Sequence, residues 1–466
     1  MPFETVVLSI AIFLASLVPA VMWWRSDAAE RPRFPLAGFT GLFYGVFFGL
    51  SALLSPLLPR GADGAIMYYD TPFPDGVSME AQFLVLGGLA AAWLAYALAR
   101  HVLAPGMPAF RVPESIDTRW ALVLLWFLVA GHALYLTSTT VSSLPSIGPF
   151  LMPAILVALI GFWEYRRTER MGKRHFLIAI MTILALVVLG FFESTAITPA
   201  IIFMVIFWSL LIGQRPRLAL TLLVIAIILF PIAYTANIGA REFMYRWNAT
   251  GTMTERTQAL AVATALRLRV LSCSIGFGSE TSCRTDEGKE LKRSTSDDRF
   301  FATRLGHIFL MERVVGETPD NVPWANGATY TRLLTNLVPR ALWPDKPREN
   351  LGNQFGREYG LLSSIENEMS LNFPWNVEMY ANFGAAGAIV GMAIVGALLA
   401  LLEMFFLAPR IVGASYAVGL AIAGPLFFQE SNTSLMLGNV PAVILTMWFY
   451  FFIGAAATPW LTKIRS

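Results

Sequence analysis

Long apolar stretches alternate with short polar connectors along most of this chain, and one long polar segment, residues 238–380, interrupts the pattern. A helix needs about 20 apolar residues to cross the core of a bilayer. By this criterion the sequence predicts eleven membrane spans, at residues 3–24, 37–58, 81–103, 120–137, 147–163, 176–192, 197–213, 218–236, 382–407, 411–429 and 438–460. Helices are expected because backbone polar groups in lipid must find their partners within the segment.

The composition agrees with a membrane protein. Hydrophobic residues make up 56% of the chain, charged residues 14%, and the mean hydropathy is +0.59, which together exclude an ordinary soluble domain. We therefore expect an all-α, polytopic integral membrane protein. It would comprise eight spans in residues 1–237, a large loop with short helices in 238–380, and three spans in 381–466.

The distribution of positive charge predicts the orientation. Alternate connectors hold sixteen Lys and Arg residues, whereas the short connectors of the other set hold only Arg60. Because cytoplasmic connectors carry the excess of Lys and Arg, the N-terminus and the long loop are expected outside the cytoplasm. The first span has Glu4 before it and its positive charges after it, which is not the pattern of a cleavable signal peptide.

Both cysteines of the chain, Cys273 and Cys283, lie in the loop. On the oxidising side of the membrane they are expected to form a disulfide, which would contribute about 2–3 kcal/mol. Two free thiols are the alternative. A zinc site is not expected, because no other Cys or His lies nearby in the sequence.

Within the loop, helical spacing predicts helices over 255–271, 299–315 and 326–338, followed by an extended proline-rich stretch to Pro347. Basic and aromatic side chains are interleaved there. Arginine forks and lysine ammonium groups suit phosphate, and aromatic faces stack on sugar rings. The candidates are Arg241, Arg304, Arg340 and Lys346 for phosphate and Tyr330, Trp343 and Tyr380 for sugar. Anchoring at the lipid interface is the alternative, because the loop holds 17 acidic residues against 17 basic ones.

His307 and Glu378 are the candidates for a general base. His307 is the only histidine of the loop, and Glu378 lies just before the ninth predicted span. The histidine could instead bond a carbonyl group, and the glutamate could pair with an arginine or cap a helix. Glu193 and Glu430 lie at the ends of spans, where ionisable groups are costly and often functional, although both could simply reach the interface.

Two segments carry a resemblance to a known family. Asn326-Gly-Ala-Thr-Tyr330 with Leu337 to Pro347, and Glu378-Met-Tyr-Ala-Asn382-Phe-Gly384 to Gly387, resemble bacterial oligosaccharide repeat unit polymerases of the O-antigen and exopolysaccharide (Wzy) type. The many-span topology with one large outer loop is also similar. The segment 272–298, which is rich in Ser, Gly and charged residues and holds both cysteines, is not part of this resemblance.

The resemblance implies a glycosyltransferase that needs no metal or cofactor and works at the periplasmic side of the bacterial inner membrane. It would transfer a growing glycan from undecaprenyl pyrophosphate onto a new lipid-linked repeat unit. Arg340, Lys346 and Glu378 match motif positions, Asn382 would bind sugar, and Arg304 and His307 rest on chemistry alone. The implied partners are the lipid-linked oligosaccharide, membrane lipid, a chain-length regulator and a flippase, with no nucleic acid.

Three alternatives remain. A ligase would transfer finished glycan to lipid A core or to a protein by the same chemistry. A lipid-linked oligosaccharide transporter would move the glycan without a reaction, and a structural membrane subunit would do neither. A transporter is expected to line its spans with charged residues, so the nearly charge-free predicted spans favour an enzyme.

Overall fold

The computed structural model describes residues 3–111, 305–371 and 373–438, apart from gaps within 56–70, 337–349 and 366–369, together with isolated residues between 181 and 265 and between 440 and 456. The five spans predicted between 120 and 236, the helix predicted over 255–271 and most of the last span lie outside these residues. The chain divides into two compact units. The first comprises Met1–Phe110, Ser296–Ile411 and Ile422–Ala442, and it contains nearly everything described below.

The described residues are mostly helical, as predicted, and four helical segments are long and apolar enough to cross a membrane. They correspond to the predicted spans 3–24, 37–58, 81–103 and 382–407. These segments are Phe3–Arg25 (α1 Phe3–Ser16 and α2 Val18–Arg25), Leu36–Leu53 (α3 Leu36–Tyr44, the π-helical turn η1 Gly45–Leu50 and α4 Ser51–Leu53), Met79–Gly106 (α5 Met79–Leu103 and the 3-10 turn η3 Ala104–Gly106) and α18 Trp375–Phe406.

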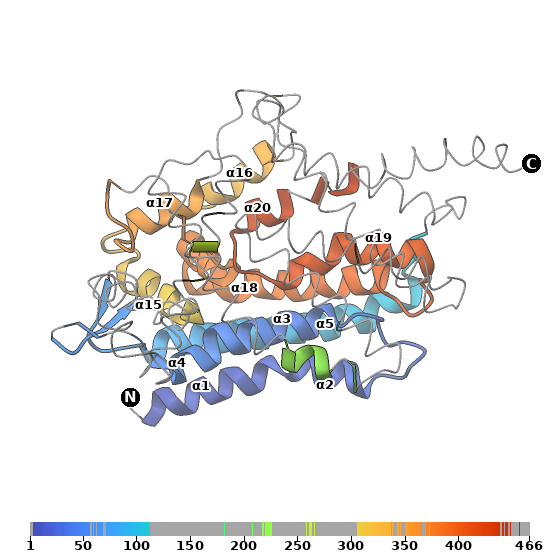
Figure 1. The fold of residues 1–466 in the computed structure, drawn as a ribbon, viewed down its shortest axis with the longest axis horizontal. Helices are drawn as coiled ribbons and strands as arrows, with labels where there is room; N and C mark the ends of the chain where they lie inside the picture. Colours follow the sequence, from blue (N-terminus) through green and yellow to red (C-terminus); the bar gives the residue numbers. More distant parts are fainter. Residues whose placement is uncertain are drawn as a thin grey trace, which may run out of the picture. The chain divides into compact units, whose positions relative to one another are not determined.

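Glycines let these helices pack closely, and α1, α3, α5 and α18 run side by side (Figure 1). Gly41, Gly45 and Gly49 form a stripe on α3 and η1 that faces α1. A Cβ atom at Gly41 would lie 2.1 Å from the carbonyl oxygen of Ser16, so only glycine fits there. Small residues at every fourth position are the usual way for helices to approach each other in a membrane.

The long polar segment contributes α15 (His307–Glu317), α16 (Ala328–Asn336) and α17 (Leu351–Glu358) to the same unit. Helix α16 confirms the helix predicted over 326–338. Helix α15 lies within the predicted 299–315 region but begins at His307, and residues 299–304 are outside the described part of the chain.

Helix α15 is buried on several sides because other elements of the unit surround it. A hairpin of β1 (Ile66–Tyr68) and β2 (Thr71–Phe73) covers it, and Tyr68 stacks on Phe309 with ring centroids 5.5 Å apart. At its other side Glu312 accepts hydrogen bonds from the backbone N–H and hydroxyl of Ser78, the residue that caps α5. The hairpin and the start of α5 therefore fix the position of α15.

The tenth predicted span, 411–429, consists of α19 (Gly413–Ala423) and the 3-10 turn η5 (Gly424–Phe427). A short irregular stretch then leads into α20 (Thr433–Gly438). Residues Gln429–Ser434, called the connector below, are buried or half-buried within the first unit although all six carry polar side chains that favour water. This conflict between polarity and burial points to the functional site.

Candidate functional site

The connector touches three separate parts of the first unit. The Tyr44 hydroxyl on α3 donates to Gln429 Oε1 at 2.9 Å, and the Trp375 N–H at the start of α18 donates to the Gln429 carbonyl at 3.4 Å. Glu430 lies against α15, and the backbone N–H of Thr433 donates to Glu378 Oε2 at 2.7 Å. The connector therefore brings His307 and Glu378, the two predicted bases, to one region of the fold.

His307 forms a buried pair with Glu430. Its Nε2 lies 3.4 Å from Glu430 Oε1, and the two side chains are only 1% and 3% exposed. A carboxylate beside one imidazole nitrogen orients the ring and raises its basicity. This arrangement suits the His307–Glu430 pair to accepting a proton. Among the described residues, no three His, Cys, Asp or Glu side chains lie together as metal ligands would.

An aromatic wall encloses this pair. The rings of Phe43, Phe47 and Phe48 lie 6.1, 4.7 and 6.0 Å from the imidazole, measured between centroids. The π-helical turn explains why all three reach it, because five-residue hydrogen bonding turns Phe43 and Phe48 to the same side. Apolar walls strengthen the electrostatic coupling between the imidazole and the carboxylate.

Glu378 lies in the first turn of α18 and not just before the helix as the sequence predicted, and its side chain is fully buried. Tyr330 faces it from α16. Burial, and then the negative charge of Glu378, raises the pKa of the Tyr330 hydroxyl well above its ordinary value. A neutral tyrosine hydroxyl beside a carboxylate is a hydrogen-bond donor, which makes Glu378 the centre of a second polar group.

The two motifs that carry the family resemblance bind each other. Gly384 interrupts α18 with φ 66° and ψ −156°, a conformation available only to glycine. The carbonyls of Ala381 and Asn382 then accept hydrogen bonds from the N–H groups of Ala325 (3.0 Å) and Asn326 (3.2 Å). The break in the helix therefore ties the segment before α16 to the start of α18.

The Asn382 amide completes this tie. Its Oδ1 accepts from the Gly327 N–H, and its Nδ2 donates to Thr329 Oγ1 and to the Glu378 carbonyl, each at 2.8 Å. The side chain is fully buried and both ends of the amide are occupied. This geometry gives Asn382 a structural role, and its predicted sugar contact stays a prediction.

The predicted sugar-binding aromatics divide into two kinds. Tyr330 stacks on Phe383 at 6.2 Å, and Tyr380 meets Trp324 edge to face at 5.6 Å, so both rings take part in packing. Trp343 is 39% exposed and remains accessible to a ligand. Arg241, Arg304, Arg340, Lys346, Cys273 and Cys283 lie outside the described residues, so the phosphate site and the disulfide stay predictions.

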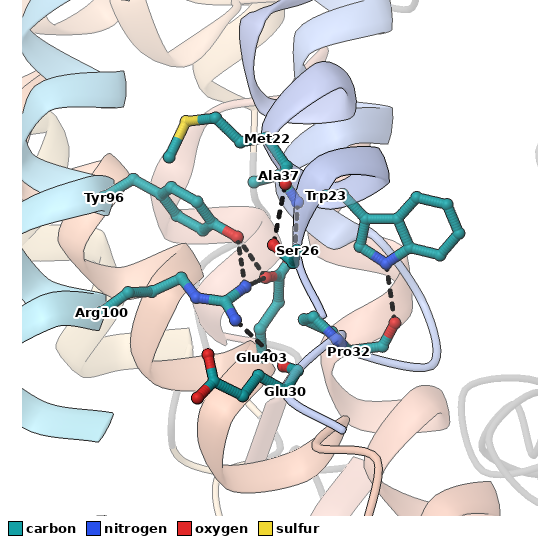
Figure 2. Close-up of polar contacts among 9 residues, drawn as sticks. All are labelled: Met22, Trp23, Ser26, Glu30, Pro32, Ala37, Tyr96, Arg100 and Glu403. Atoms are coloured by element: carbon teal, nitrogen blue, oxygen red, sulfur yellow. Dashed lines mark hydrogen bonds and ion pairs between the residues drawn. The ribbon is translucent and has the colours of Figure 1, made fainter. Parts of the chain in front are cut away.

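A separate buried polar group, centred on Glu403, lies farther along α5 and α18 (Figure 2). Glu403 Oε2 accepts from the Tyr96 hydroxyl at 2.5 Å and lies 3.3 Å from Arg100 Nη1, while its Oε1 accepts from the Ala37 N–H at 2.9 Å. Arg100 also donates to the Glu30 carbonyl at 3.1 Å. The few charged side chains of these nearly charge-free spans are therefore paired with each other inside the protein.

Sequence reasoning missed the four neutral members of the site. Asn376, Gln429, Asn432 and Thr433 are buried and carry side-chain atoms without a hydrogen-bond partner in the part of the chain that the structure describes. A polar run directly after a predicted span, Gln429 to Ser434, was the available signal. This polar stretch indicates a buried polar site only when the fold shows that it packs against other parts of the protein.

Comparison with known proteins adds one match. Residues 278–457 match the family described as Domain of unknown function (DUF8712). This segment contains α15 to α18 and the connector, and so every residue of the site except those on α3 and η1. No curated protein and no solved structure matches the chain.

Proposed function

We propose that this protein is a membrane glycosyltransferase that polymerises undecaprenyl-pyrophosphate-linked repeat units into a surface polysaccharide at the periplasmic face of the bacterial inner membrane. The observation that carries the proposal is the buried His307–Glu430 pair, which shares the connector with Glu378. A base held by a carboxylate beside segments rich in Arg and Trp fits a sugar acceptor and a phosphate leaving group.

In the proposed reaction His307 takes the proton from the acceptor hydroxyl of the new repeat unit. The oxygen forms a bond to the anomeric carbon of the growing glycan, and the bond from that carbon to the pyrophosphate oxygen breaks. The pyrophosphate leaves with the electron pair, and positive side chains stabilise its charge. Arg340, Lys346, Arg304 and Arg241 are the candidates for this role. Pyrophosphate leaves readily, so no general acid is required.

The geometry favours His307 over Glu378 as the base. Glu378 Oε2 already accepts the Thr433 N–H, so this oxygen is engaged in holding the connector. The His307 imidazole has its Nε2 beside the Glu430 carboxylate, which can orient the ring for proton transfer. We therefore assign Glu378 to orienting the connector and Tyr330, and Glu430 to orienting His307.

The test supplies short lipid-pyrophosphate-linked repeat units to the purified full-length protein in nanodiscs and separates the products by size. We expect the wild type to produce a ladder of longer glycans. His307→Ala and Glu430→Gln should slow lengthening by roughly 10²–10⁴-fold, the usual contribution of a positioned base. Glu317→Gln, which changes a half-buried glutamate paired with Arg313 away from the site, is the matched control and should behave as wild type.

Two results would overturn the proposal. Movement of the lipid-linked units across the bilayer without lengthening would identify a transporter. If His307→Ala makes the same ladder as the wild type, His307 is not the base, and the His307–Glu430 pair no longer supports the proposal.

A further inference from the structure

Four neutral side chains around the connector, called the amide cluster, have hydrogen-bonding atoms without a partner in the described part of the chain. Within the described residues these atoms are both amide atoms of Asn376, Nε2 of Gln429, Nδ2 of Asn432 and Oγ1 of Thr433. The four residues are 3%, 0%, 5% and 8% exposed. Each is therefore more than nine-tenths buried and cannot be satisfied by bulk water.

The members of the amide cluster lie together. The Trp375 N–H, next to Asn376, donates to the Gln429 carbonyl, and the Tyr44 hydroxyl contacts both Gln429 Oε1 and the backbone of Asn376. The Thr433 N–H donates to Glu378, which lies two residues after Asn376 in α18. Tyr44 thus contacts Gln429 and Asn376, and Glu378 contacts Thr433.

This concentration calls for a polar occupant. Buried polar atoms almost always have a partner, because an unpaired one loses its hydration without compensation. In the same unit Asn382 meets that requirement with three hydrogen bonds, whereas Gln82 Oε1 and Trp93 Nε1 are single atoms that lack a partner among the described residues. Five atoms on the connector and the start of α18 lack a partner in the described part of the chain, a concentration that suits the binding of a polar group.

The chemistry of the cluster defines the occupant. Its free groups are mainly donors, namely three amide N–H₂ groups and one hydroxyl, with an amide oxygen and the same hydroxyl as acceptors. The cluster contains no Lys or Arg, and the carboxylates of Glu378 and Glu430 stand beside it. Neutral groups with several hydroxyls satisfy this pattern, whereas an anion would meet two negative charges.

We propose that the amide cluster binds a neutral sugar ring of the glycan, and that it discriminates against acidic sugars and against the pyrophosphate itself. This inference rests on the proposed function, in which a lipid-linked glycan is the substrate. It separates the two ends of that substrate. The sugar beside the base is recognised by uncharged amides, and the pyrophosphate is held by the basic residues of the loop.

The test uses the full-length protein in nanodiscs prepared without glycoside detergents and measures binding by saturation-transfer NMR. The neutral probes are methyl glucoside and N-acetylglucosamine, and the anionic probes are glucuronate and inorganic pyrophosphate. We expect a neutral probe to bind, and Thr433→Val and Asn432→Leu to weaken that binding by roughly tenfold, about the effect of one hydrogen bond. Asn321→Leu, an exposed asparagine, is the matched control and should leave binding unchanged.

Thr433→Val also provides a readout that does not depend on the probe. It preserves shape and the backbone hydrogen bond to Glu378 but removes the unpaired hydroxyl. Without sugar, the variant should therefore unfold at a higher temperature than the wild type, and added neutral sugar should stabilise only the wild type. When a residue binds a ligand but destabilises the free protein, its replacement is expected to raise stability and to weaken binding.

Three results would overturn the inference: no binding of any neutral probe, equal binding of glucuronate through the same residues, or sugar binding unaffected by both substitutions. A Thr433→Val variant that is less stable, with unchanged sugar binding, would assign the cluster to buried water only. The glycan ladder assay keeps the two proposals apart. If the wild type binds sugar, Thr433→Val loses that binding, and neither protein makes a glycan ladder, the polymerase proposal is refuted and the sugar site is retained. If Thr433→Val makes the same ladder as the wild type, the polymerase proposal is retained and the sugar site is refuted.

Discussion

Two buried polar groups in the same unit differ in how completely the protein satisfies them. Around Glu403, each carboxylate oxygen has a partner, and Arg100 and Tyr96 complete the network. Around the connector, the side chains of Asn376, Gln429, Asn432 and Thr433 keep atoms that have no partner among the described residues. A satisfied buried network fixes helices relative to each other, whereas an unsatisfied one is suited to binding something else. Burial and polarity alone would not distinguish them.

The largest expected effect tests the satisfied side of this comparison. Glu403→Leu leaves Arg100 without its carboxylate and the Ala37 N–H without its acceptor, so it should destabilise the fold by roughly 3–5 kcal/mol. The measurement is the thermal unfolding midpoint in nanodiscs. Arg100→Met combined with Glu403→Leu should recover part of the loss, because no unpaired charge remains.

An exposed ion pair provides the control for that experiment. Glu317→Leu removes the partner of Arg313 from a pair whose side chains are 29% and 19% exposed, and it should cost no more than about 1 kcal/mol. Equal stability of Glu403→Leu and the wild type would show that the Glu403 network does not fix α3, α5 and α18.

A matched pair of substitutions in one helix gives the next effect. Asn382→Leu leaves the Gly327 N–H and the Thr329 hydroxyl without their partner and should cost about 3 kcal/mol. Asn376→Leu removes an amide that has no partner in the described part of the chain, so it should be neutral or stabilising when no sugar is present. The comparison of unfolding midpoints contradicts our account if both variants lose stability equally.

The smallest effect concerns alkaline pH. Because burial and Glu378 raise the pKa of Tyr330, the folded protein keeps this proton while the unfolded chain releases it near pH 10. Stability should therefore fall as pH rises above about 10, and the fall should be shallower in Tyr330→Phe. Unfolding midpoints measured at several pH values give the two slopes. Identical slopes would show that Tyr330 does not lie beside the carboxylate.

The sequence predicted the broad class well because that class depends on composition and on local pattern. Apolar stretches of sufficient length indicated helices, and the four long apolar helices that the structure describes coincide with predicted spans. The helix around 326–338 was also predicted, since Pro339 ends it locally. His307 and Glu378 were singled out because ionisable side chains are rare in such a chain.

What only the tertiary structure decided is which polar groups have partners, since that depends on contacts between residues far apart in the chain. The sequence could not show that Gly327 and Thr329 bind the amide of Asn382 next to the break at Gly384. It left Glu430 open between a functional and an interfacial role, and the fold places this residue against His307, more than a hundred positions earlier. Local pattern determines where a helix forms, but hydrogen-bond satisfaction is a property of the packed molecule.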